Sequence, residues 1–418
     1  MASSSMQPVV AANKSILTPV MTLEGHKRFN YNLRNGERDL YPQVRSISYF
    51  PDGKQMISGA LDMTIRRWDL REGKEIEEVR DVCEQRVDML EVSRDGRWVV
   101  TAGGGNHTTE GGKLKVCEVE TGFVRIFQSH SKPQWIQCID ISPDSTLLAA
   151  GSIDYILDGI GSSTARIWNL DTGKLVAGPF KNDHCLGSVR FSRDSKKLAV
   201  MLDIAKRLEV WDVQTQKLVV SVGNSSYSGD WTLARTPVFW TTQDKTIVAA
   251  FSFKNFKPRI DVRDDPITIY EFDASILEIV GAPFKGHTRF IANLALSFDC
   301  ALLASTAYDN TAYDNTIKLW AFQSRQLLAS FDVQLLDMLI YSPNSHQLAY
   351  TTLGDTKIHI YDIPLDILAS IRPTRQEKPS TSASKIPDLF NVRVPILLLH
   401  CSINASIAVR RNTSCRAP

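Results

Sequence analysis

Residues 44–70 read VRSISYFPDGKQMISGALDMTIRRWDL and divide into three short runs of β-branched and apolar residues. The first run ends at the turn residues Pro51-Asp52-Gly53, and the second ends at Leu61-Asp62. The third run closes on Trp68-Asp69. Runs of four to seven such residues, bounded by Gly, Pro or Asp, are typical of β-strands joined by tight turns. We therefore expect three consecutive strands in this segment.

The same pattern recurs along the chain in seven copies. The turn after the first strand of each copy reads, in order, YFPDG, VSRDG, ISPDS, FSRDS, TTQDK, LSFDC and YSPNS. Each third strand ends in an aromatic–acid pair or a remnant of one, at Trp68-Asp69, Cys117-Glu118, Trp168-Asn169, Trp211-Asp212, Tyr270-Glu271, Trp320-Ala321 and Tyr361-Asp362. These ends lie 41 to 59 residues apart, and most copies add a fourth run after another turn. Seven repeats of four antiparallel strands predict an all-β fold, a single seven-bladed β-propeller.

The repeats resemble those of the WD40-repeat family, and Gly25-His26 and Gly286-His287 supply the Gly-His pair of that family. The resemblance covers residues 17–371 and implies one propeller over that range. The expected cores from the first to the third strand are about 44–70, 87–119, 136–170, 186–213, 236–272, 291–322 and 336–363. We expect residues 1–16 to be disordered and residues 372–418 to form a basic, largely disordered or irregular tail.

The seventh repeat needs a fourth strand to complete its sheet. The run Thr18–Leu23 precedes Gly25-His26, which is where a fourth strand lies in other repeats, so we predict that it pairs with the last blade and closes the ring. Closure removes sheet edges that would otherwise be exposed. The competing candidate for the closing strand is Pro364–Ile371.

The composition is that of an ordinary soluble globular protein, with 43% hydrophobic and 22% charged residues and a net charge of +2. The charge is uneven, because the tail from Arg372 carries +6 and the preceding residues carry −4. No signal peptide and no run of 18 apolar residues is evident, so we expect an intracellular protein, cytoplasmic or nuclear, without a membrane span. The seven cysteines form no CxxC pair, and we expect no metal and no cofactor.

The family implies an internal hydrogen-bond relay of His, Ser or Thr, Asp and Trp, which satisfies a buried imidazole and a buried indole N–H. The relay residues of repeat 1 are His26, Ser58, Asp62 and Trp68. Those of repeat 6 are His287, Ser305, Trp320 and either Asp314 or Asp309, because the segment TAYDN is duplicated there. A Ser-His-Asp set can indicate catalysis, but this one recurs with the repeats and is expected to be structural.

The residues at the start of each first strand are the candidate binding surface. Aliphatic residues such as Val44, Val87 and Ile136 recur at the same position of each repeat, so this side of the strand should face the packing between blades. Successive side chains of a strand point to opposite sides, so the residues next to these positions should lie near one opening of the ring. In the family, these positions and the residue before the Asp of the second turn carry partner contacts. The candidate surface is Arg45, Leu61, Arg86, Asp88, Trp135, Gln137, Arg235, Phe290, Tyr313 (or Tyr308) and Asp337.

The preferred function is a non-catalytic scaffold or adaptor that binds a protein or peptide on this top face, as a monomeric propeller within a complex. The alternative is a chromatin- or nucleic-acid-associated reader, which would need a strongly basic face. A propeller enzyme would need acidic or His side chains that meet at the channel, and Asp88 and Asp337 come nearest to that requirement.

Overall fold

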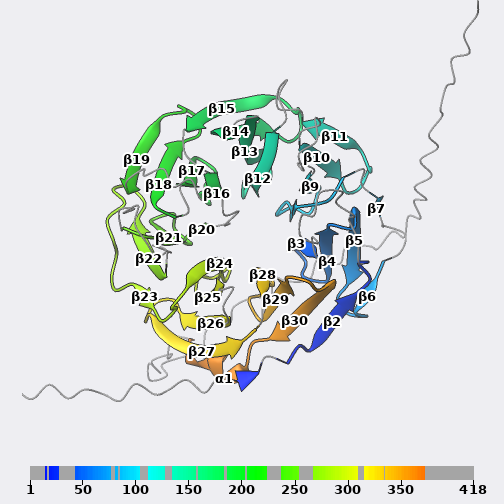
Figure 1. Cartoon of the computed structure of the whole chain (residues 1–418), viewed down its shortest axis with the longest axis vertical. Helices are drawn as coiled ribbons and strands as arrows, with labels where there is room; N and C mark the ends of the chain where they lie inside the picture. The colour runs from blue at the N-terminus through cyan, green and yellow to red at the C-terminus, as the bar shows by residue number, and fades with distance from the viewer. Residues whose placement is uncertain are drawn as a thin grey trace, which may run out of the picture. The chain divides into compact units, whose positions relative to one another are not determined.

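The computed structural model describes residues 15–16, 18–27, 43–76, 81–82, 85–103, 112–127, 134–156, 159–182, 186–202, 205–223, 237–253, 267–308, 315–333 and 335–371. The chain divides into two units, 1–372 and 373–418, and all described residues lie in the first. In that unit the strands form seven small sheets around a central opening (Figure 1). The expected all-β, seven-bladed propeller is confirmed.

Each sheet is one blade, and we name its strands a to d from the channel outward. Blade 1 contains β3 (Val44–Tyr49), β4 (Gln55–Ala60), β5 (Thr64–Asp69) and β6 (Lys74–Glu75), and β7 (Asp81–Val82) also pairs with β5. Blade 2 contains β8 (Met89–Val92), β9 (Trp98–Gly103), β10 (Lys113–Glu118) and β11 (Val124–Phe127). Blade 3 contains β12 (Gln134–Ile141), β13 (Leu147–Ile156), β14 (Gly159–Asn169) and β15 (Leu175–Asn182).

The remaining four blades repeat this order. Blade 4 contains β16 (Leu186–Phe191), β17 (Lys197–Leu202), β18 (Arg207–Asp212) and β19 (Leu218–Gly223). Blade 5 contains β20 (Val238–Trp240), β21 (Thr246–Ala250), β22 (Thr268–Asp273) and β23 (Phe284–Lys285). Blade 6 contains β24 (Phe290–Leu296), β25 (Leu302–Tyr308), β26 (Thr316–Ala321) and β27 (Gln326–Asp332). Strands a to c of blade 7 are β28 (Leu336–Tyr341), β29 (Gln347–Thr352) and β30 (Lys357–Asp362).

Strand d of blade 7 comes from the N-terminal part of the chain. Strand β2 (Met21–Glu24) pairs antiparallel with β30, from Met21 opposite Ile360 to Glu24 opposite Lys357. In Figure 1 the dark blue β2 lies directly beside the orange β30. The short β1 (Ser15–Ile16) adds in parallel to β27 of blade 6. The competing segment forms helix α1 (Leu365–Ser370) instead of a strand.

Helix α1 packs at the junction of blades 6 and 7 through Ile367 and Leu368. Within the described ranges, no helix has the length and apolar character that crossing a membrane requires.

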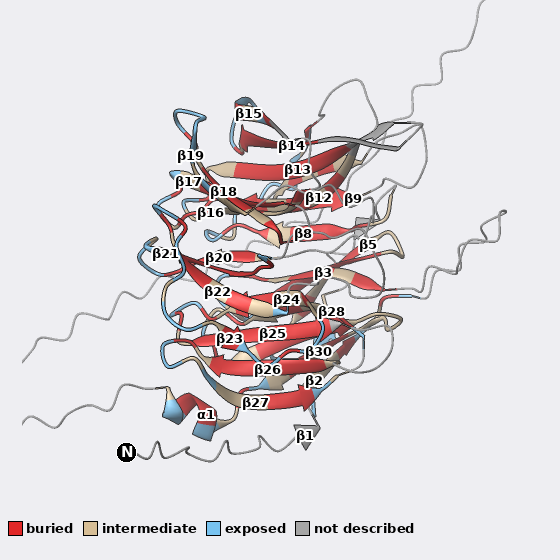
Figure 2. Ribbon diagram, turned by 60° about the vertical axis from the view of Figure 1, so that its left-hand side comes forward, coloured by how far each residue is buried: buried red, intermediate tan, exposed pale blue. Residues whose placement is uncertain are grey.

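The hydrophobic core is divided among the junctions between neighbouring blades. Each of seven clusters of buried residues joins two adjacent blades, and together they include the junction of blade 7 with blade 1. At that junction Leu23 of β2 packs with Val44, Met56 and Trp68 of blade 1. Figure 2 shows buried residues along most strands and exposed residues mainly in the loops and on outer strands. Burial of a large aliphatic side chain contributes about 1.5–3 kcal/mol, so these junctions supply most of the stability of the ring.

The turns between strands a and b form the face that we call the turn face. Each of these turns has one residue with a left-handed backbone, namely Gly53, Gly96, Ser145, Ser195, Asp244, Cys300 and Ser345. Several of these side chains accept a hydrogen bond from the turn of the preceding blade. Ser145 accepts from the backbone N–H of Asp95, and Asp244 accepts from those of Arg193 and Asp194. At these non-glycine positions, the unfavourable left-handed backbone conformation is accompanied by a hydrogen bond between neighbouring blades.

These turns also correct the sequence alignment of repeat 5. The left-handed residue in blade 5 is Asp244, the fourth residue of TTQDK, whereas in the six other turns it is the fifth. The hydrogen bond from Thr241 N to Thr246 O confirms this placement, because Ser192 N bonds to Lys197 O in blade 4 with the same spacing. The position predicted from sequence for the repeat 5 turn, TTQDK, is therefore one residue too late, and the turn begins at Trp240.

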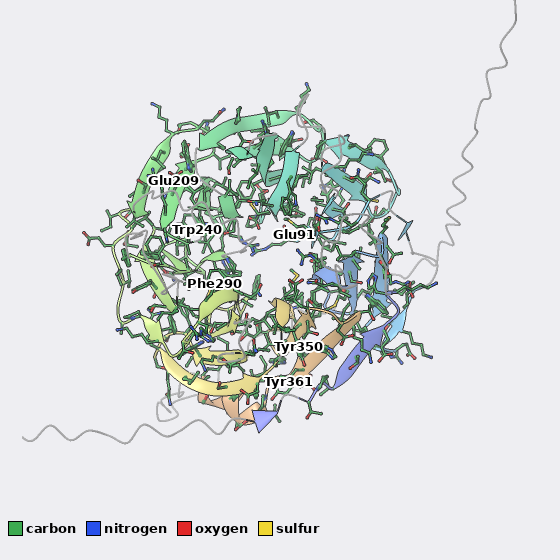
Figure 3. All side chains as sticks on the ribbon, in the orientation of Figure 1. Glu91, Glu209, Trp240, Phe290, Tyr350 and Tyr361 are labelled. Atoms are coloured by element: carbon green, nitrogen blue, oxygen red, sulfur yellow. The ribbon has the colours of Figure 1, made fainter. Side chains whose placement is uncertain are left out.

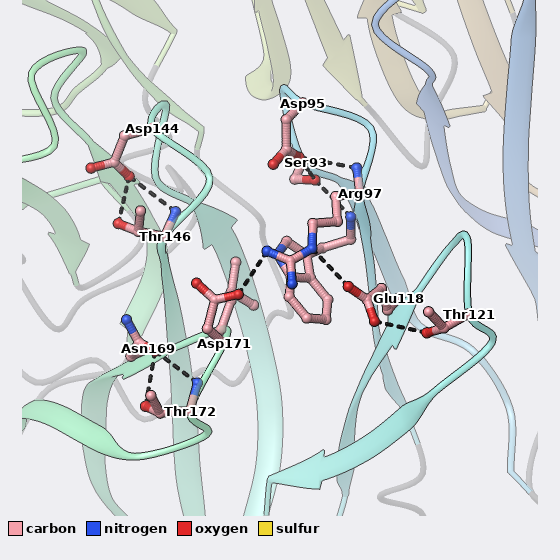
Figure 4. A network of polar contacts seen from close by, with 12 residues as sticks. Ser93, Asp95, Arg97, Glu118, Thr121, Asp144, Thr146, Asn169, Asp171 and Thr172 are labelled. Atoms are coloured by element: carbon pink, nitrogen blue, oxygen red, sulfur yellow. Dashed lines mark hydrogen bonds and ion pairs between the residues drawn. The ribbon is translucent and has the colours of Figure 1, made fainter.

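Side chains on the turn face also join blades 2 and 3. The Arg97 guanidinium donates through Nε to Glu118 Oε1 and through Nη1 to Asp171 Oδ1, each at 2.7 Å (Figure 4). Glu118 belongs to the same blade as Arg97, whereas Asp171 belongs to the next. These groups are exposed to solvent, which screens their charges, so each pair adds little to the stability of the ring.

Candidate functional site

The centre of the ring is a channel of about 690 Å³. It is lined by strand a of every blade, with Ser46, Leu90, Ile139, Val189, Phe239, Leu294 and Ile340 among its lining residues. One end of the channel opens at the turn face. The other end opens where the strands a begin, which we call the top face. In Figure 3, Glu91 and Phe290 lie near the central opening, whereas Glu209 and Tyr361 lie farther out.

The main feature of the top face is a chain of alternating charges that crosses three blades. Arg86 Nε lies 2.9 Å from Asp88 Oδ2 in blade 2. Asp88 Oδ1 lies 3.9 Å from Arg45 Nε of blade 1, and Arg45 Nη1 lies 3.4 Å from Asp337 Oδ1 of blade 7. Asp88 is 4% exposed. A buried carboxylate is costly unless it is paired, and the two arginines supply partners for Asp88.

Several buried polar atoms at the top face have no hydrogen-bond partner among the described residues. They are Gln43 Nε2, Gln85 Oε1, Gln137 Oε1 and Asp337 Oδ2. Gln43 directly precedes β3, Gln85 lies four residues before β8, and Gln137 and Asp337 lie in the first half of β12 and β28. Native proteins satisfy most buried polar atoms, so unsatisfied atoms near the start of strand a in blades 1, 2, 3 and 7 call for an explanation.

The other predicted top-face residues are distributed around the ring. Trp135 and Phe290 are half-buried, at the start of β12 in blade 3 and of β24 in blade 6. Leu61 is half-buried, and its backbone N–H donates to Gln43 O at 3.1 Å. Arg235, Tyr313 and the side chain of Tyr308 lie outside the described residues. The structure therefore joins Arg45, Arg86, Asp88 and Asp337 through ion pairs, whereas Trp135 and Phe290 belong to blades 3 and 6, which this chain of charges does not include.

Sequence reasoning missed Gln85 as a member of this face and left Gln43 out of the candidate surface. Gln43 directly precedes Val44, the first residue of β3, and Gln85 lies two residues before Val87 and four before the start of β8. A polar residue shortly before strand a could have been recognised in the sequence as a candidate for the top face, because this segment lies at that end of the channel.

The relay residues of blade 1 are joined by hydrogen bonds. Trp68 Nε1 donates to Ser58 Oγ at 2.8 Å, and His26 Nε2 lies 2.7 Å from the same oxygen. On the other side of the imidazole, His26 Nδ1 lies 3.1 Å from Asp62 Oδ2. Asp62 also accepts from Thr64 Oγ1 at 2.6 Å and from Lys27 N at 2.8 Å. Burial alone would raise the pKa of Asp62, but the hydrogen bonds and the charge of His26 lower it to about 2.

Blade 6 has the same arrangement around Ser305. Trp320 Nε1 donates to Ser305 Oγ at 2.8 Å, and His287 Nε2 lies 2.8 Å from that oxygen. Asp309 and Asp314, the two candidates for the fourth position, lie outside the described residues. Blade 4 uses a different acceptor, because Trp211 Nε1 donates to Glu209 Oε2 at 2.9 Å. These groups bond to one another inside the blades and present no nucleophile to the channel.

A second charged group lies in the channel wall. Arg190 Nη1 of blade 4 lies 2.6 Å from Asp140 Oδ1 of blade 3 and 3.7 Å from Glu91 Oε1 of blade 2. Burial and the negative charge of Asp140 together raise the pKa of Glu91 to about 8, although the charge of Arg190 and a backbone hydrogen bond from Ile141 act in the opposite direction. Burial also raises the pKa of Asp140. Across the described ranges, no set of three or more His, Cys, Asp or Glu side chains could hold a metal ion.

Comparison with known proteins agrees with this architecture. The family model "WD domain, G-beta repeat" matches residues 37–69, 122–169 and 279–321. Periodic tryptophan protein 2 of Arabidopsis thaliana is 26% identical over 170 residues, which is 40% of this chain and 17% of that protein. Autophagy-related protein 16 of Arabidopsis thaliana is 29% identical over 128 residues, 30% of this chain and 22% of that protein.

A third relative is eukaryotic translation initiation factor 3 subunit I of Bombyx mori. It is 23% identical over 213 residues, which is 50% of this chain and 56% of that protein. The chain thus spans less than two thirds of the length of each of these three relatives.

Proposed function

Because this chain is a WD40-repeat β-propeller protein, we propose that it acts as a non-catalytic scaffold that binds a protein or peptide across its top face. The observation that carries the proposal is the group of unsatisfied buried polar atoms on Gln43, Gln85, Gln137 and Asp337. These atoms have almost no accessible surface, so their side chains would turn outward for the backbone N–H and C=O groups of a bound segment to satisfy them.

The charges of the top face also suit a polypeptide partner. Arg45, Arg86, Asp88 and Asp337 alternate in sign, so the surface offers pairs to both acidic and basic side chains. Trp135 and Phe290 add half-buried aromatic rings in blades 3 and 6, and aromatic residues and arginine are enriched in interface hot spots. The proposal includes a monomeric propeller within an intracellular complex, in the cytoplasm or the nucleus.

Affinity purification tests the proposal directly. Tagged wild-type protein and the triple variant Trp135→Ala/Phe290→Ala/Arg86→Ala are purified from the same cells, and the co-purifying proteins are identified by mass spectrometry. We expect the variant to lose the main partners, because truncation of a hot-spot side chain typically costs 2 kcal/mol or more. Nuclease treatment before elution should leave those partners bound, whereas a nucleic-acid reader would lose them.

The matched control is Phe123→Ala/Ile276→Ala/Arg71→Ala. It removes two large apolar side chains and one arginine at exposed positions on outer turns and strands. The control should capture the same partners as wild type, and both variants should melt cooperatively. If the top-face variant and wild type capture the same proteins, the assignment of the top face is wrong.

A further inference from the structure

Two arginines converge on one phenylalanine ring at the turn-face end of the channel. Arg94 of blade 2 and Arg193 of blade 4 place their guanidinium carbons 5.2 Å and 5.1 Å from the ring centroid of Phe298 in blade 6. Phe298 is 55% exposed, and Arg94 is also exposed. Arg94 and Phe298 both line the channel. The three residues come from alternate blades, so they narrow this end of the channel from separate sides.

No carboxylate neutralises these two guanidinium groups among the described contacts. Arg193 Nη2 donates to the carbonyl oxygen of Phe298 at 2.7 Å and lies 3.9 Å from Cys300 Sγ. Within the described part of the chain, Arg94 makes no hydrogen bond or ion pair, and its guanidinium group lies over the Phe298 ring. Burial lowers the pKa of Arg94 and the like charge of Arg193 lowers it further, whereas the charges of Asp140 and Asp244 act in the opposite direction. The pair therefore repels across the mouth of the channel.

The carboxylates nearby are already engaged with backbone groups. Asp95 Oδ1 accepts from Ser93 Oγ and Arg97 N, and Asp299 Oδ1 accepts from Ser297 Oγ and Ala301 N. Asp244 uses both oxygens on the backbone N–H groups of Arg193 and Asp194. Deeper in the channel, Asp140 is paired with Arg190. These bonds hold the acidic groups in the turns, and Asp140 and Asp244 attract Arg94 only from beyond ion-pair distance. Among the described residues, neither guanidinium group therefore has a direct carboxylate partner, and both can take an external anion.

We propose that the turn-face end of the channel binds a phosphate-class oxyanion between Arg94 and Arg193. A guanidinium group can donate two parallel N–H hydrogen bonds to such an anion. An anion that contacts both arginines attracts each of them and offsets the repulsion between their like charges. A free phosphate and the phosphoryl group of a modified side chain offer this same chemistry, and the titrations below distinguish them. This site lies at the opposite end of the channel from the top face and goes beyond the proposed scaffold function.

Isothermal titration calorimetry and thermal denaturation test the site with sodium pyrophosphate as the probe, at an ionic strength held constant with sodium chloride. Wild type should bind with submillimolar affinity and melt at a higher temperature when the probe is present. The variant Arg94→Gln/Arg193→Gln should lose about tenfold or more in affinity, because each lost charged hydrogen-bond donor weakens oxyanion binding. A second titration compares a phosphoserine peptide with its unphosphorylated form, which separates a side-chain source from a free anion.

The control variant Arg71→Gln/Lys217→Gln removes the same formal charge from exposed positions and should bind like wild type. If pyrophosphate and the phosphopeptide bind equally well to wild type and Arg94→Gln/Arg193→Gln, the proposal is overturned. Absence of binding to wild type at millimolar concentrations of either probe also overturns it.

Discussion

Ser58 shows at the residue scale how a small side chain organises a blade. Its hydroxyl is fully buried, accepts from Trp68 and contacts His26, so one oxygen satisfies an indole and an imidazole. Without such partners each of these groups would cost about 1–3 kcal/mol in the core. Ser305 does the same in blade 6. In blade 3 the corresponding position is Ala150, and Trp168 instead stacks on Phe127 with a centroid distance of 6.0 Å.

Asp62 should make blade 1 sensitive to acid. Its pKa of about 2 in the folded protein lies below the usual value near 3.9 of an unfolded chain. A lowered folded pKa stabilises the protein above the unfolded value, and this contribution is lost as pH falls from about 4 to about 2. We expect Asp62→Asn to lower the free energy of unfolding by about 2 kcal/mol at pH 7. The difference between variant and wild type should shrink as pH falls below 4.

Urea denaturation at pH 7, 4.5 and 3 measures this change. Asp52→Asn serves as the control, because Asp52 is exposed and accepts a hydrogen bond only from the nearby backbone N–H of Lys54 among its described contacts. It should stay within about 0.5 kcal/mol of wild type at each pH. A constant difference between Asp62→Asn and wild type over this range would show that Asp62 does not carry the acid sensitivity.

At the scale of the element, strand β2 joins the two ends of the propeller domain. It forms the outer strand of blade 7, and its Leu23 side chain is fully buried against blade 1. The turn alignment of repeat 5 shows the limit of sequence reasoning at this scale. Asp244 has a left-handed backbone, and its carboxylate accepts hydrogen bonds from the turn of the preceding blade. The other turns have Gly, Ser or Cys at this left-handed position, so the sequence alone did not indicate that Asp244 occupies it.

Removal of β2 should destabilise the whole ring. Leu23→Ala empties space in the cluster that joins blades 7 and 1, and a buried Leu→Ala change costs about 2–5 kcal/mol. Deletion of residues 1–24 should lower the melting temperature further or cause aggregation, because it exposes the edge of β30. Val20→Ala is the control, since Val20 is 57% exposed and should change stability by less than about 0.5 kcal/mol. Equal melting temperatures for wild type and the deletion variant would exclude β2 as a stabilising closure.

At the scale of the whole molecule, the propeller could be predicted from sequence because each repeat carries its own turn and an aromatic–acid pair or a remnant of one. Contacts between distant repeats could not be predicted in the same way. Arg45 and Asp337 are 292 residues apart, and they meet only because the ring closes. The chain of Glu91, Asp140 and Arg190 was missed although all three occupy the same position of strand a in consecutive blades. The charged residues at this repeated position of strand a could have been noticed in the sequence. Whether they pair depends on the distance between strands a of neighbouring blades, which only the structure gives.

This group in the channel wall should make the stability of the ring depend on pH near neutrality. The folded protein holds the pKa of Glu91 at about 8, above that of an unfolded chain, because burial and the charge of Asp140 disfavour the carboxylate. The folded state therefore binds more protons, so stability falls as pH rises toward 8 and levels off above it. The slope for one such group is at most about 1.4 kcal/mol per pH unit. Glu91→Gln should flatten this slope, because an amide does not titrate.

Chemical denaturation of wild type, Glu91→Gln and the exposed control Glu72→Gln at half-unit steps from pH 5.5 to 9 tests this expectation. The control should follow wild type, since Glu72 has a half-exposed side chain beside Arg71 on an outer turn. Because Glu91, Asp140 and Arg190 belong to blades 2, 3 and 4, loss of the proton on Glu91 acts on the contact between blades rather than within one. The change should therefore appear in the single cooperative transition of the ring. If the free energy of unfolding changes with pH in the same way for wild type and Glu91→Gln, the pKa of Glu91 in the folded protein is that of an ordinary carboxyl group.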